Sequence, residues 1–115
     1  MRETLAEKVA WCRHGVRTYF VGALRAGDEG IRLTGRDPAS GIDLALSIPM
    51  AEVEHVRVSA FRHELLGGEP CVVLELADSE SIFIRQVGVG PLQVHLLARR
   101  LGALTQTPPL LAQGG

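Results

Sequence analysis

Apolar and polar residues alternate along most of the chain between residues 16 and 86, a pattern typical of half-buried β-strands. The clearest run is 42–48, where isoleucine and leucine face one way and Asp43, Ala45 and Ser47 face the other. Residues 61–70 are ambiguous and could hold one further short strand. We therefore expect six or seven antiparallel strands, with runs at 16–25, 31–36, 42–48, 56–60, 72–76 and 82–85.

Turn-forming residues separate these runs at intervals that suit hairpins. Gly27, Asp28, Glu29 and Gly30 make the turn of one hairpin, and the segment 37–41 contains the turn formers of the next. A third turn is expected at 77–80, and a single helical turn at 49–52. Short connections of this kind predict three hairpins along the chain.

Two segments follow a helical period instead. Thr4 and Glu7 have the spacing of a capping box, and apolar residues recur at helical intervals until Gly15, so we predict a short helix over 4–14. A longer helix is predicted over 90–104, beginning near Pro91, with an apolar stripe of Val94, Leu97, Leu101 and Leu104.

These elements predict one mainly β domain with α-helix (α+β) over residues 1–104, followed by a flexible tail at 105–115. Six or seven antiparallel strands would form a bent sheet or partly open barrel, and the C-terminal amphipathic helix would close one open end. A chain of 115 residues is long enough for one such core and too short for two.

The order of elements resembles the pleckstrin-homology-like (PH-like) superfamily, particularly its small bacterial members. The resemblance is carried by the segments 30–33, 46–56, 72–76, 82–85 and 91–104. It implies a module that binds or scaffolds other molecules and is seldom catalytic.

Some PH-like domains bind phosphoinositides through basic residues in and beside the first hairpin. The matching positions here are Arg25 and Arg32, but the loop between them carries Asp28 and Glu29 and has no lysine. This departure argues against phosphoinositide binding.

The charge balance narrows the class of partner. A net charge of −1 is not that of a dedicated nucleic-acid binder, but seven basic and four acidic residues lie in 2–36, against two and nine in 37–84. The basic part of one copy could therefore meet the acidic part of another, which predicts a homo-oligomer. If the two parts lie together in one subunit, the charges simply solvate it.

The start of the chain and its apolar runs resemble neither a signal peptide nor a membrane span. Cys12 and Cys71 are too few for a disulfide framework or a zinc site. We therefore expect a cytoplasmic protein with both thiols reduced.

The first hairpin yields the main candidate binding surface. If Leu24 lies opposite Ile31, the outward positions of this hairpin gather four arginines around one tyrosine. Guanidinium groups match carboxylate and phosphate geometry, so this face could bind an anion or an acidic protein, although a solvated outer face is an alternative interpretation. The candidate residues are Arg17, Tyr19, Arg25, Arg32 and Arg36.

An alternative anion site rests on Arg13 and Arg17, which have the Arg-x-x-x-Arg spacing of PilZ domains that bind cyclic dinucleotides. Asp37, Ser40 and Gly41 are similar to the second motif of that family, but their spacing differs from it. On this hypothesis the protein would be a small-ligand sensor.

Catalytic chemistry is not indicated. An enzyme needs a nucleophile beside a base, or ligands at metal spacing, and the four histidines His14, His55, His63 and His95 supply neither. The sequence therefore predicts a non-catalytic module without cofactor or metal, which acts through protein–protein contacts or self-association.

Overall fold

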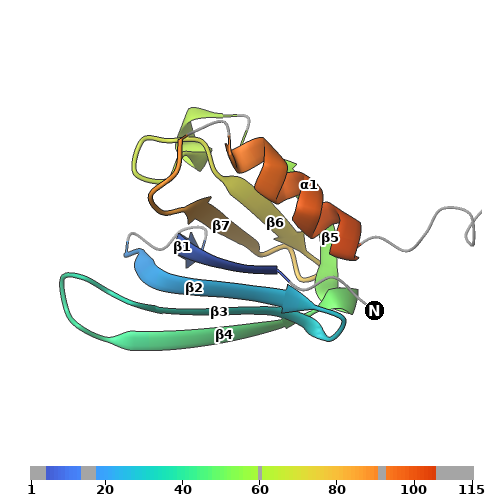
Figure 1. Cartoon of the computed structure of the whole chain (residues 1–115), viewed down its shortest axis with the longest axis horizontal. Coiled ribbons are helices and arrows are strands. Elements are labelled where there is room, and N and C mark those ends of the chain that lie inside the picture. The colour runs from blue at the N-terminus through green and yellow to red at the C-terminus, as the bar shows by residue number, and fades with distance from the viewer. Residues whose placement is uncertain (1–4, 14–17, 60, 91–92, 106–115) are drawn as a thin grey trace, which may run out of the picture.

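The computed structural model describes residues 5–13, 18–59, 61–90 and 93–105. These residues form one open antiparallel sheet of seven strands in the order β4-β3-β2-β1-β7-β6-β5, followed by a helix (Figure 1). The strands are β1 (Leu5–Arg13), β2 (Phe20–Gly27), β3 (Gly30–Arg36), β4 (Asp43–Pro49), β5 (Val53–Val58), β6 (Val72–Leu76) and β7 (Ser81–Gln86), and the helix is α1 (Gln93–Thr105). Short 3₁₀ turns lie at η1 (Met50–Glu52), as predicted, and at η2 (Arg62–Glu64).

The predicted class, mainly β with a C-terminal helix, is confirmed, but the predicted helix over 4–14 is wrong. Residues 5–13 form β1, which pairs with β2 on one side and with β7 on the other. Its four consecutive residues 9–12 are all buried, because both faces of this central strand are covered. Apolar and polar residues do not alternate in a strand that is buried on both faces. The apolar residues of this segment therefore also matched the spacing of a helix.

The β2–β3 hairpin has a different register from the predicted one. Leu24 lies opposite Leu33 rather than Ile31, because the loop is only Asp28-Glu29 and the pair Gly27–Gly30 closes it. The offset is an even number of residues, so each side chain keeps its predicted face.

The seventh strand is β1, and the ambiguous segment 61–70 contains no strand. That segment holds η2 and an isolated bridge between Leu66 and Glu69. The predicted start of the C-terminal helix at Pro91 lies outside the described residues, and so do residues 106–115 of the predicted tail. Within the described part, α1 ends at Thr105.

Two hydrophobic clusters lie on opposite faces of the sheet. The larger one joins the inner face of the strands to Val94, Leu97 and Leu101 of α1, which confirms the predicted stripe. The helix lies mainly over β5 and also reaches β6, β7 and β2 (Figure 1). The smaller cluster lies behind β1, β6 and β7, where Leu66 and Cys71 cover Ala10, Cys12, Val73 and Phe83.

Trp11 of β1 anchors the larger cluster. Its side chain is fully buried, its indole N–H donates to the main-chain oxygen of Thr34 at 3.0 Å, and its ring lies 5.0 Å from that of Phe20. A Cβ atom added at Gly35 would stand 2.8 Å from Cβ of Phe20 and 3.0 Å from Nε1 of Trp11. Glycine at position 35 therefore leaves the space in which the indole reaches β3.

Substitution of Gly35 by alanine should lower the free energy of unfolding by about 1–3 kcal/mol, because a core without spare volume must shift to admit a methyl group. Urea denaturation followed by the fluorescence of Trp11 measures this change. Gly102→Ala is the matched control, since a Cβ atom there meets nothing within 4 Å and alanine favours the helix. Equal stability of Gly35→Ala and the wild type would contradict the packing described.

Candidate functional site

The outer face of β2, β3 and β4, which points away from the larger cluster, is not covered by any residue that the structure describes. Behind β1, β6 and β7 the corresponding face is occupied by the segment 61–71, but this segment does not extend to β2–β4. The outward side chains of β2–β4 are consequently exposed, including those of Val21, Ala23, Arg25, Arg32, Ala45 and Ser47. A bare sheet face of this kind is available to a partner.

Arg25 and Arg32 lie directly opposite each other on this outer face. Both are exposed, and within the described residues neither forms a hydrogen bond or an ion pair. Like charges on paired strands repel, so the fold gains nothing from this arrangement.

Arg36 lies on the same face but is already paired. Its guanidinium donates to both carboxylate oxygens of Asp43, at 2.9 and 3.2 Å. The hydrogen bonds and charge of Arg36 lower the pKa of Asp43 below its ordinary value. The predicted grouping of Arg25, Arg32 and Arg36 on one face therefore holds, with one of the three neutralised.

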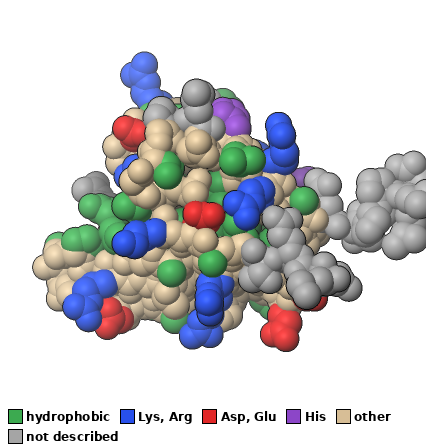
Figure 2. Space-filling view, viewed as in Figure 1, with side chains coloured by type: hydrophobic (Ala, Val, Ile, Leu, Met, Phe, Trp, Pro, Cys, Tyr) green, Lys and Arg blue, Asp and Glu red, His purple; other side chains and the backbone are tan. Residues whose placement is uncertain are grey.

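The structure describes only one of the two remaining residues of the predicted binding surface. Tyr19 precedes β2 and has 45 % of its surface exposed, and Arg17 lies outside the described residues. Figure 2 shows separate Lys and Arg side chains over the β2–β4 half of the molecule, with acidic side chains between them.

A shallow depression on the outer face adds a residue that sequence reasoning missed. It has a volume of ≈ 520 Å³, and its lining includes Ala6, Ala23 and Thr34 together with the basic residues Lys8 and Arg25. Lys8 was missed because its segment was interpreted as a helix. Had 5–13 been considered as a strand, the outward spacing of Ala6 and Lys8 would have placed it on this face. We call the surface formed by Lys8, Arg25, Arg32 and Arg36 the basic face.

A second depression, of ≈ 830 Å³, lies at the turn end of the β2–β3 hairpin. Arg25, Arg32 and Ser47 line it together with the loop residues Asp28 and Glu29. Arg25 belongs to both depressions, so the basic face continues from the sheet to the hairpin tip. The loop acids give this end a mixed charge.

The alternative anion site is less favourably arranged. Arg13, at the end of β1, contacts both carboxylate oxygens of Glu80, at 2.6 and 2.7 Å. Asp37 and Ser40 bind each other within the β3–β4 turn, where the Ser40 hydroxyl donates to Asp37 at 2.7 Å and lowers the pKa of that carboxyl. Gly41 closes the same turn with a φ of 77°, which suits glycine.

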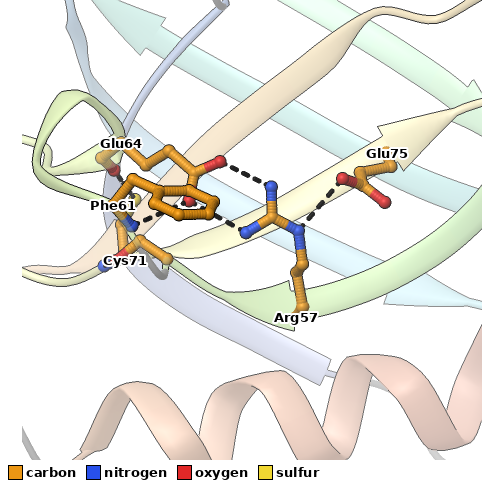
Figure 3. A network of polar contacts seen from close by, with 6 residues as sticks. Arg57, Phe61, Glu64, Cys71 and Glu75 are labelled. Carbon is orange, nitrogen blue, oxygen red and sulfur yellow. Dashed lines mark hydrogen bonds and ion pairs between the residues drawn. The ribbon is translucent and has the colours of Figure 1, made fainter.

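Sequence reasoning also missed a partly buried ionic network, centred on the buried Glu64, that holds the segment 61–71. The guanidinium of Arg57 donates to both carboxylate oxygens of Glu64, at 2.9 and 2.6 Å, and to Glu75 at 3.0 Å (Figure 3). Glu64 also accepts from the Phe61 N–H, while its main-chain oxygen accepts from the Cys71 thiol at 3.0 Å. Most of these contacts join residues of different structural elements, β5, η2 and β6, so the periodicity of the sequence does not predict them.

The histidines were the remaining candidates for catalytic or metal-binding residues. His55, His63 and His95 are exposed, and His14 lies outside the described residues. Among the described residues, no three His, Cys, Asp or Glu side chains are placed to hold a metal ion together. No helix in the described part of the chain is long and apolar enough to cross a membrane.

Searches of protein-family models and of curated proteins find no match to this sequence. Function is therefore inferred from the geometry of the molecule.

Glu64→Ala should expose Cys71, because it removes the contacts that fix the segment 61–71 over the smaller cluster. Burial raises the pKa of the Cys71 thiol to about 11, so in the wild type this group stays protonated and unreactive near neutral pH. We expect faster thiol labelling in Glu64→Ala, measured in a Cys12→Ala background, and a loss of about 1–3 kcal/mol of stability.

Glu69→Ala is the control for this change, since Glu69 belongs to the same segment and is exposed. Labelling of Cys71 should stay slow in that variant. Equally slow labelling in Glu64→Ala would contradict the role assigned to the ionic network.

Proposed function

We propose that this protein is a non-catalytic binding or scaffolding module of the PH-like type, which acts in the cytoplasm through protein–protein contacts or self-association. The basic face is its binding surface, and the ligand it fits is a carboxylate-rich protein segment. The observation that carries the proposal is the exposed cross-strand pair of Arg25 and Arg32.

The two guanidinium groups favour an anionic partner for a simple electrostatic reason. Their mutual repulsion is relieved when a carboxylate lies between them, and guanidinium forks bind carboxylates through two parallel hydrogen bonds. Arg36 is neutralised by Asp43, so among the described residues the charge of the basic face that no carboxylate pairs with comes from Arg25, Arg32 and Lys8. Ala23 and Thr34, which also line the depression, have short side chains that let an extended chain approach the sheet closely.

The architecture supports the assignment to the PH-like superfamily. An open sheet of seven antiparallel strands followed by α1, which packs on its inner face, fits the bent sheet with a C-terminal helix that the resemblance implies. Domains of that type act by presenting a surface, and the uncovered outer face of β2–β4 is such a surface. The PilZ-like alternative has less support, because the guanidinium of Arg13 is bound by Glu80.

The double variant Arg25→Glu/Arg32→Glu should weaken binding of a fluorescein-labelled oligoglutamate peptide by roughly tenfold or more, because two attractive charges become repulsive. Fluorescence anisotropy measures the affinity, which should also fall as salt is raised. Arg99→Glu is the matched control, since Arg99 is exposed on α1, away from the basic face. Equal affinity of the double variant and the wild type would overturn the assignment of this surface.

A further inference from the structure

We infer that the open edge of β4 pairs with β4 of a second copy of this chain, so that two sheets join across a twofold axis. This inference rests on the self-association included in the proposed function and names the surface responsible for it.

The main chain of β4 is oriented for such pairing. The N–H of Asp37 donates to the main-chain oxygen of Ile42 at 2.9 Å, which shows that the even-numbered residues of this strand point their peptide groups toward β3. The intervening residues Asp43, Ala45 and Ser47 therefore turn their N–H and C=O groups to the open edge. All three are exposed.

The two edges of the sheet are protected to very different degrees. β5 carries three charged or titratable side chains, Glu54, His55 and Arg57, has an irregular register between Val53 and His55, and lies under α1. β4 carries Asp43 at its start and Pro49 at its end, but it has neither a charge nor a proline between them, and its register is regular along its whole length. Native proteins blunt unpaired edges with charges, bulges or covering elements, so the bare edge of β4 indicates a partner strand.

One antiparallel register uses every outward N–H group of β4. Ala45 then pairs with the partner's Ala45 on the twofold axis, and Asp43 pairs with the partner's Ser47. A register centred one residue later would set Asp43 against the partner's Pro49, which has no N–H to donate.

Hydrophobicity and charge are both compatible with this register. On the outer face Asp43 of each copy lies opposite the uncharged Ser47 of the partner subunit, so no like charges meet across the seam. On the inner face Leu44, which is 39 % exposed, comes to lie against the partner's Leu46. Each contact occurs twice, as a twofold axis requires.

Sedimentation velocity of the full chain from about 5 µM to about 500 µM should show a monomer–dimer equilibrium, since association follows mass action. Ala45→Lys places two like charges opposite each other on the axis and should raise the dimer dissociation constant by roughly tenfold or more. Ala103→Lys, on the exposed surface of α1, is the matched control and should dimerise like the wild type.

Ala45→Pro provides a second test, because it removes an outward N–H group that no strand of the same chain uses. Circular dichroism and the urea midpoint show whether each variant is folded. A folded wild type that stays monomeric at the highest concentration overturns the inference, as does a dimer that folded Ala45→Lys and Ala45→Pro leave intact. Neither result touches peptide binding by the basic face, which Arg25→Glu/Arg32→Glu tests independently.

Discussion

The position of β1 between β2 and β7 is the constraint on which the rest of this structure depends. This strand is hydrogen-bonded on both sides, and it contributes to both hydrophobic clusters. Its Trp11 crosses the inner face to bond the backbone of β3, in a space that Gly35 leaves open. Without β1 the two halves of the sheet would share no strand.

The two halves that β1 joins are covered differently, and this difference points to function. Strands β6 and β7 are enclosed by the core under α1 on one face and by the segment 61–71 on the other, which Arg57 and Glu64 hold in place. Strands β2–β4 have the larger cluster on one face and solvent on the other, and they end in an open edge. The enclosed half supplies stability, while the open half presents the charges and peptide groups that a partner can bind.

The sequence predicted those strands and the helix that have one buried face and one face exposed to solvent. The alternation in β2, β3 and β4 and the stripe of α1 were found for this reason, and Arg25 and Arg32 were placed on one face even though the hairpin register was shifted. The pattern failed for β1, because apolar and polar residues do not alternate in a strand that is buried on both faces. For the same reason Lys8 was not predicted to lie on the basic face. The ionic network could not be predicted, because Arg57, Glu64 and Glu75 meet only through tertiary contacts.

The central claim is that the β2–β4 half binds other chains through its basic face and its open edge. Amide hydrogen exchange of the wild type at low and high protein concentration tests the edge directly. At low concentration the amides of Ala45 and Ser47 should exchange fast while those of Leu44 and Leu46, which point toward β3, are protected. At high concentration Ala45 and Ser47 should become protected as well. Fast exchange of both amides at every concentration would contradict the pairing of β4.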